Sequence, residues 1–115
     1  MGDQLMLCDE NGSVLRLYEA RGLARIRGLI GRPGPPRGSG VFFRRCSSVH
    51  GFGMTYAIDV IFIDRAWIVV GTGRLRPWRI VSHPGAWSAI ELAEGECKRL
   101  AIAAGVKFTQ REGGQ

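Results

Sequence analysis

The 115-residue sequence predicts a mainly β fold, namely a small antiparallel sandwich or jelly-roll-like barrel with one or two short helices. Short apolar or alternating segments recur about every ten residues between Gly- and Pro-rich turns, which is typical of sandwiches and barrels. Strands and helices do not alternate regularly along the chain, so a parallel α/β sheet is not expected. We expect one β-sandwich domain over residues 1–110 and a disordered tail over residues 111–115.

The first forty residues predict a β-hairpin, a short helix and a loop. Asn11-Gly12 is a strong hairpin-turn signal within residues 4–18, and the residues after it alternate as a strand does. Residues 20–30 place apolar side chains at a helical spacing. Residues 31–40 are rich in Pro and Gly, so we expect an exposed loop there.

The strongest strand signal is Ile-Asp-Val-Ile-Phe-Ile at residues 58–63, which is apolar on both faces except at Asp59. Such a run is typical of a central strand that is covered on both sides. Further strands are expected over residues 41–43, 67–70, 86–92 and 106–109, with one or two helical turns over residues 94–101.

The net charge of +6 is concentrated between residues 16 and 45, where eight Arg residues accompany a single Glu. A basic segment can bind nucleic acid or another anionic partner by releasing counterions. The alternative is a solvated Arg-rich surface, which we favour because no nucleic-acid docking motif accompanies the charge. The candidate basic patch consists of Arg21, Arg25, Arg27, Arg32 and Arg37.

Asp59 is the most informative polar residue, because it shares a predicted core face with apolar side chains. A carboxylate on a core face is costly unless it is paired or hydrogen-bonded. Asp59 therefore either lines a pocket or has a fixed partner. Candidate partners are His50, Arg74, Arg76 and the backbone N–H groups near Gly51 and Gly53.

A candidate groove for a small ligand or a protein segment surrounds this carboxylate. Arg76-Pro77-Trp78 places a cation beside a large aromatic face, which suits recognition by cation–π contact and stacking. Three Trp residues in a small domain favour an apolar groove, although they can also simply fill the core. The predicted groove residues are His50, Met54, Asp59, Arg76 and Trp78.

Cys46, His50 and Asp59 raise the alternative of a small hydrolase or a metal-dependent enzyme. In an extended segment, however, residues four apart are separated by about 13 Å, which is too far to share a metal or a proton. The three cysteines are far apart in the chain and form no Cys-x-x-Cys pair, so reduced thiols are expected. We therefore expect a non-catalytic domain without metal or cofactor.

The chain contains no apolar run of about 20 residues, so no membrane span is expected. Its first residues are acidic where a signal peptide requires basic ones, and no long apolar segment follows them. We therefore expect a cytoplasmic protein.

Several motifs in this order resemble the prokaryotic family called domain of unknown function 192. The most specific is His50-Gly-Phe-Gly-Met54 followed by Ile58-Asp59-Val-Ile-Phe-Ile-Asp64. The resemblance extends over residues 14–108 and implies a mainly β, sandwich-like domain with minor helix. It implies no reaction, because the family has none assigned. Other matching elements are Arg27-Gly-Leu-Ile-Gly-Arg32, Leu75-Arg-Pro-Trp78 and Glu91-Leu-Ala-Glu-Gly95, whereas Thr55, Ala57 and Val106 depart from the family pattern.

Overall fold

The structure of the protein is a computed structural model that describes residues 4–21 and 34–111. Most of the predicted helix over residues 20–30 and of the predicted tail over residues 111–115 lies outside the described residues. The same holds for Arg25, Arg27 and Arg32 of the candidate basic patch.

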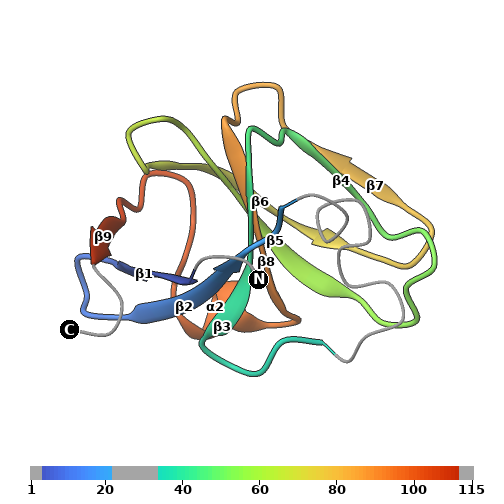
Figure 1. Cartoon of the computed structure of the whole chain (residues 1–115), viewed down its shortest axis with the longest axis horizontal. Helices are drawn as coiled ribbons and strands as arrows, with labels where there is room; N and C mark the ends of the chain where they lie inside the picture. The colour runs from blue at the N-terminus through green and yellow to red at the C-terminus, as the bar shows by residue number, and fades with distance from the viewer. Residues whose placement is uncertain (1–3, 22–33, 112–115) are drawn as a thin grey trace.

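The described residues form nine strands and one short helix (Figure 1). The prediction of a mainly β fold with little helix is therefore confirmed. The elements are β1 (Gln4–Cys8), β2 (Val14–Glu19), β3 (Ser39–Arg44), β4 (Ser48–His50), β5 (Ile58–Ile63), β6 (Val69–Leu75), β7 (Ile80–Ser82), β8 (Ser88–Ala93), α2 (Glu96–Arg99) and β9 (Thr109–Arg111).

The strands form a seven-stranded sheet in the order β6-β5-β8-β3-β2-β1-β9 and a separate two-stranded ribbon of β4 and β7. Neighbouring strands are antiparallel except β2 and β3, which run parallel, so the main sheet is mixed. A parallel pair requires a long crossover. Here the crossover occupies the residues between Glu19 and Ser39.

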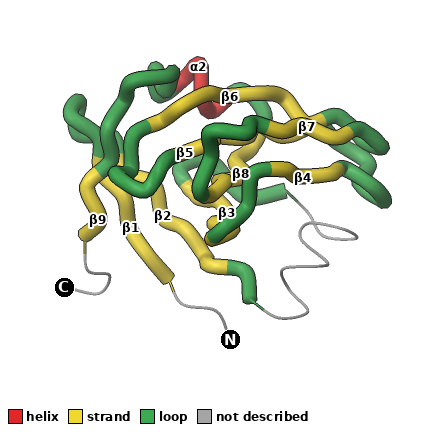
Figure 2. Tube along the Cα trace, turned by 90° about the horizontal axis from the view of Figure 1, so that it is seen from above, coloured by secondary structure: helices red, strands yellow, loops and turns green. Residues whose placement is uncertain are grey.

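Backbone contacts draw the two edges of the main sheet together at one end, although the described strands do not form a closed barrel. Val69, which begins the edge strand β6, donates to the carbonyl of Val106 at 2.8 Å. Phe108, which directly precedes the opposite edge strand β9, donates to the carbonyl of Trp67 at 2.9 Å. The sheet is therefore strongly curved. Figure 2 shows β1, β2 and β9 on one side of the molecule and the β4–β7 ribbon on the other.

Two hydrophobic clusters lie on the two faces of the central strand β5. The larger one fills the inside of the curved sheet and includes Ile61, Ile63 and Phe42. The second lies under the β4–β7 ribbon and includes Val60 and Phe62. All six residues of β5 are buried, as expected for a strand that is covered on both sides.

The β4–β7 ribbon alternates between the second cluster and solvent. Val49 pairs with Val81, and both pack against this cluster. The next pair along the ribbon, His50 and Ile80, is exposed. Since successive side chains of a strand point to opposite faces, this register sets which side chains the ribbon presents to solvent.

The described part of the chain has no helix with the length and apolarity that crossing a membrane requires. All three cysteines are free thiols.

Candidate functional site

Four of the predicted groove residues lie in two neighbouring surface features, a hollow and an exposed patch. The fifth, Met54, is buried. Asp59 and Arg76 line one surface hollow. His50 and Trp78 lie on an exposed patch of the β4–β7 ribbon and the turn that precedes β7. Met54 is only 4% exposed and belongs to the cluster under the ribbon, so its side chain does not face solvent. Arg76 and Trp78 are two residues apart and connect the two features.

The Asp59 carboxylate is held by α2 and by Arg74. Its Oδ2 accepts a hydrogen bond of 2.9 Å from the backbone N–H of Cys97, and its Oδ1 lies 3.9 Å from Nε of Arg74. Arg74 was one of the predicted partners. Cys97 was missed, although the first N–H groups of any helix lack partners within that helix and readily bond a carboxylate.

The hollow beside Asp59 has a volume of about 490 Å³ and carries mixed charge. Arg76 and Lys98 contribute two cations, and neither forms an ion pair with a described residue. Arg74 is already engaged, since its Nε lies 3.4 Å from Glu94 Oε2. The described residues that line the hollow are Asp59, Thr72, Gly73, Arg74, Arg76, Gly95, Cys97, Lys98 and Ile102.

The cysteine and histidine side chains of this region make local contacts. Burial, followed by the nearby charge of Asp59, raises the pKa of the Cys97 thiol to about 12, so this thiol stays protonated and unreactive at neutral pH. Cys46 Sγ donates to the carbonyl of Ser48 at 3.1 Å, and His50 Nδ1 accepts from the backbone N–H of Phe52 at 3.3 Å. Within the described ranges, no three His, Cys, Asp or Glu residues come together as metal ligands.

The exposed patch is a row of aromatic side chains with one aliphatic neighbour, and we call it the aromatic patch (His50, Phe52, Trp78 and Ile80). The ring centroids of His50 and Phe52 are 4.9 Å apart, and those of Phe52 and Trp78 are 6.1 Å apart. Phe52, Trp78 and Ile80 are 42%, 67% and 59% exposed, and they are the exposed large hydrophobic residues of the described chain. The groove predicted from the sequence did not include Phe52 or Ile80.

Tight backbone contacts hold the aromatic patch in place. Gly51 donates to the carbonyl of Arg79, and Trp78 donates to the carbonyl of Gly51, both at 2.8 Å. A Cβ atom at Gly51 would lie 2.5 Å from the carbonyl oxygen of Arg76, so only glycine fits at that position. Trp78 has a φ of 65°, in the left-handed region that a bulky residue seldom occupies. Strained backbone of this kind is often found at functional sites.

Two exposed arginines flank the aromatic patch. Arg76 and Arg79 stand on either side of Pro77 and Trp78 in the sequence, and both are exposed. The patch therefore combines stacked aromatic rings with positive charge, a composition enriched at protein interfaces.

The basic segment is described only in part. Arg21 lies 3.4 Å from Glu19, and Arg44 lies 2.9 Å from the same residue. The Arg44 guanidinium holds the pKa of the Glu19 carboxyl below its usual value. Part of the positive charge counted in the sequence is therefore matched by a buried carboxylate. Arg37 is exposed.

A third buried carboxyl, Glu91, was not among the predicted site residues. It lies on β8 between Val41 of β3 and Val60 of β5, and it is only 4% exposed. Its Oε1 has no hydrogen-bond partner among the described residues. Burial raises the pKa of Glu91 to about 7, so its charge state changes near neutral pH.

A strongly curved mixed sheet, with a two-stranded ribbon that displays aromatic residues, defines this chain as a small mainly β domain. The chain belongs to the family called domain of unknown function 192, described as "Uncharacterized ACR", whose model matches residues 9–110. The resemblance seen in the sequence motifs is thereby confirmed.

Two relatives from Pyrococcus carry a second name for this family. A UPF0127 protein of Pyrococcus abyssi is 44% identical over 62 residues, which are 53% of either chain. A UPF0127 protein of Pyrococcus horikoshii is 53% identical over 34 residues, which are 30% of either chain. The chain thus aligns with about half of the length of one relative and less than a third of the other.

Two crystal structures share the fold. A candidate transcription regulator of Sinorhizobium meliloti 1021 has a TM-score of 0.80 at 19% identity, covering 96% of this chain and 94% of that protein. A protein of unknown function from Novosphingobium aromaticivorans DSM 12444 has a TM-score of 0.79 at 22% identity, covering 92% and 83%. At these identities the likeness concerns the fold alone.

Proposed function

We propose that this chain is a non-catalytic binding domain that holds an extended acidic segment of a partner protein on the aromatic patch and the adjoining Asp59 hollow. The observation that carries the proposal is the gathering of Phe52, Trp78 and Ile80 at one place on the surface. Contiguous exposed apolar side chains usually mark an interaction site. Exposed Trp and Arg residues contribute most strongly to binding at such sites.

The flanking charges favour an acidic partner. Arg76 and Arg79 are exposed beside Trp78, and Lys98 lines the same hollow as Arg76. Acidic side chains on an extended segment would meet these cations while an apolar side chain of the segment rests on Phe52 and Trp78. Complementary charge of this kind mainly accelerates association and selects the partner.

A protein segment fits better than single-stranded nucleic acid. Bases also stack on exposed aromatic side chains, and phosphates also bind arginine. However, a nucleic acid carries a negative charge at every nucleotide, whereas a protein segment can place acidic side chains beside Arg76 and Lys98 and neutral ones beside Asp59 and Glu94. The aliphatic Ile80 likewise suits an apolar side chain more than a base.

The other two predicted functions are weaker. Binding of nucleic acid or an anionic partner through Arg21–Arg45 stays a prediction, and the candidate transcription regulator with this fold is a reason to test it. A hydrolase or metal-dependent enzyme using Cys46, His50 and Asp59 gains no support from the described residues. Cys46 and His50 bond locally to Ser48 and Phe52, and Asp59 contacts Cys97 and Arg74.

A peptide-display selection tests the proposal. A library of random 12-residue peptides is selected on the wild-type protein alone. We expect enriched peptides in which Asp or Glu surround an aromatic or aliphatic residue. In fluorescence anisotropy, such a peptide should bind Trp78→Ala at least tenfold more weakly, as is usual for a central Trp at an interface.

Matched charge variants complete the test. Arg76→Ala and Arg79→Ala should each weaken peptide binding several-fold and reduce its salt dependence. Arg111→Ala removes the same charge from β9, at the far edge of the sheet, and should leave binding unchanged. The proposal fails if the selected peptides lack acidic residues or bind Trp78→Ala as well as wild type. Tighter binding of a labelled single-stranded 12-mer of DNA or RNA, lost in Trp78→Ala, would instead assign the patch to nucleic acid.

A further inference from the structure

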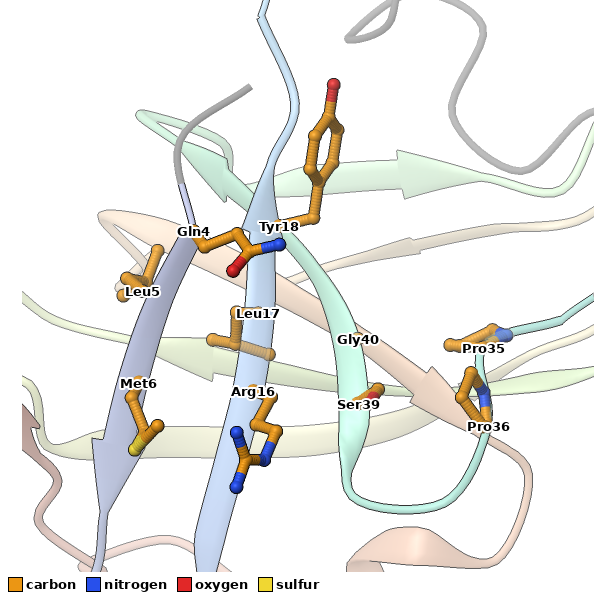
Figure 3. A pocket seen from close by; sticks show the side chains of 10 residues that line it. All are labelled: Gln4, Leu5, Met6, Arg16, Leu17, Tyr18, Pro35, Pro36, Ser39 and Gly40. Carbon is orange, nitrogen blue, oxygen red and sulfur yellow. The ribbon is translucent and has the colours of Figure 1, made fainter. Parts of the chain in front are cut away.

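A second hollow lies on the outer face of β1, β2 and β3 (Figure 3). Its volume is about 480 Å³, which is within the range of small-molecule sites. Figure 2 shows β1 and β2 on the opposite side of the molecule from the β4–β7 ribbon, with β3 nearer the middle. The residues that line it are Gln4, Leu5, Met6, Arg16, Leu17, Tyr18, Pro35, Pro36, Ser39 and Gly40.

The strand register assembles one wall of this hollow. Gln4 pairs with Tyr18 and Met6 pairs with Arg16, so these four side chains share the outer face of β1 and β2. Leu5 and Leu17, between them, turn inward to the core. The hollow therefore lies over two neighbouring cross-strand pairs.

The opposite wall consists of Pro35 and Pro36, which face the strand side chains across Ser39 and Gly40 (Figure 3). The Pro36 carbonyl accepts from the N–H of Ser39 at 3.1 Å. Proline rings restrict φ, so this wall has little conformational freedom to lose when a ligand binds.

An ion pair between the buried Glu96 and the half-exposed Arg99 holds the turn between the proline wall and β3. The N–H of Gly38 donates to Oε2 of Glu96 at 2.6 Å. Glu96 is 2% exposed and receives two hydrogen bonds from Arg99, at 2.6 and 2.8 Å. The carbonyl of Gly38 in turn accepts from the N–H of Arg16, at 2.8 Å, which joins the turn to the strand wall. The hollow is thus preformed rather than created by a ligand.

The lining determines the kind of ligand. The two prolines, Tyr18 and Met6 provide apolar contact, and a thioether adapts readily to the shape of a ring. Arg16 is the one charged lining residue, and it forms no ion pair with any described residue. A guanidinium binds a planar anion such as a carboxylate through two parallel hydrogen bonds.

We propose that this hollow, which we call the proline hollow (its ten lining residues are given above), binds a flat, largely apolar small molecule that carries one anionic group. The ring system lies between Tyr18 and the two prolines, and the anionic group pairs with Arg16. This site is separate from the proposed protein-segment site, so either can fail without the other.

Chemical-shift mapping tests the proposal with defined probes. The uniformly ¹⁵N-labelled full chain is titrated with 2-naphthoate and with neutral 2-naphthalenemethanol. We expect 2-naphthoate to shift the amide signals of β1, β2 and the residues around Ser39, with the neutral alcohol binding at least fivefold more weakly. Phosphate- and sulfonate-bearing naphthalenes distinguish which anion the site prefers.

Two variants make the result decisive. Arg16→Gln removes the charge at an exposed position and should bring the affinity for 2-naphthoate down to that for the alcohol. Trp78→Ala should leave the affinity for 2-naphthoate unchanged. The proposal is overturned if the shifts cluster at the aromatic patch, if no site-specific shifts appear, or if Arg16→Gln binds 2-naphthoate as wild type does.

Discussion

The carboxylate of Asp59 accepts a 2.9 Å hydrogen bond from the backbone N–H of Cys97, which joins the central strand β5 to the first turn of α2. The two residues are 38 positions apart in the chain. Asp59 is only 5% exposed, so this bond and Arg74 must offset the loss of hydration of its charge. The carboxylate therefore holds the fold together at the edge of the Asp59 hollow.

Replacing Asp59 should destabilise the protein. Asp59→Ala should lower the free energy of unfolding by about 2–4 kcal/mol, because it leaves the Cys97 N–H unpaired and opens a small cavity. Asp59→Asn should lower it less, since an amide oxygen can still accept the bond. Urea unfolding measures both. Glu94→Ala, at an exposed acid beside Arg74, is the control and should change the stability by under about 0.5 kcal/mol. Equal stability of Asp59→Ala and Glu94→Ala would refute this role.

Glu91 should make the protein less stable as the pH rises. Burial raises its folded-state pKa from 4.5 to about 7. Between these values the unfolded chain releases a proton that the folded chain keeps, so stability falls as pH rises through this window. Glu91→Gln removes the ionisation and should raise the free energy of unfolding by roughly 2–3 kcal/mol at pH 8, with little effect near pH 4.5.

Unfolding curves of wild type and Glu91→Gln at pH 4.5, 6 and 8 check this expectation. Glu94→Gln, which alters an exposed acid on the same stretch of chain, should show no comparable pH-dependent difference. If Glu91→Gln raised the free energy of unfolding by the same amount at all three pH values, this result would argue against the titration of Glu91.

Glu96 should have the opposite pH dependence. Its two hydrogen bonds from Arg99, together with the N–H of Gly38, hold its pKa below the usual 4.5. The stability that it contributes is present above pH 4.5 and is lost as the pH falls through the lowered folded-state pKa. Glu96→Gln should therefore cost about 1–2 kcal/mol at pH 7, a modest figure because Arg99 is itself half exposed.

The cost of Glu96→Gln should shrink below pH 4, which chemical denaturation at pH 3 and pH 7 measures. Because Glu96 also holds the turn behind the proline wall, the variant should weaken binding of 2-naphthoate at neutral pH. Glu10→Gln is a suitable control, since Glu10 is exposed in the turn between β1 and β2. If Glu96→Gln lowered the free energy of unfolding equally at both pH values, this result would contradict the assigned ionisation of Glu96.

Gly51→Ala should disrupt the aromatic patch. The added Cβ would lie 2.5 Å from the carbonyl oxygen of Arg76, which is backbone and cannot move aside cheaply. We expect a loss of more than about 2 kcal/mol in the free energy of unfolding and a change in Trp78 fluorescence. Gly12→Ala is the matched control: its Cβ meets no atom within 4 Å, so only its φ of +85° opposes the change, at about 1 kcal/mol. If the two substitutions lowered the free energy of unfolding by similar amounts, the close contact at Gly51 would not matter for stability.

The strands could be predicted because their signals are local. The apolar run of residues 58–63 indicates a strand that is covered on both faces, and β5 is such a strand. The turn at Asn11-Gly12 likewise joins β1 and β2 as an antiparallel pair. Polarity and turn chemistry act between neighbours in the chain, so they can be read without knowledge of the fold.

The arrangement of the strands could not be predicted in the same way. Nothing local indicates that β2 pairs in parallel with β3, or that β8 lies between β5 and β3. These pairings join residues that are far apart in the chain, and they depend on how whole surfaces pack. The proline hollow arises from this arrangement, because its two walls come from separate strands and a loop.

The residues predicted for the candidate site lie together only in part. Arg76 and Asp59 do share a hollow, and His50 and Trp78 do share a patch through Phe52. The partnership of Asp59 with Cys97 and the exposure of Phe52 and Ile80 were not predicted. An apolar residue in a short strand faces the core or solvent according to the register of its ribbon, and that register is set by tertiary packing.

The sequence by itself determined the mainly β class, the central strand and the family, because each depends on the order and polarity of nearby residues. Only the tertiary structure decided which side chains meet. It paired Asp59 with Cys97, placed Trp78 beside Phe52 on the surface, and set Arg16, which forms no ion pair with a described residue, opposite two prolines. Such contacts depend on distances between residues that are remote in the chain, and the curvature of a single packed sheet sets those distances.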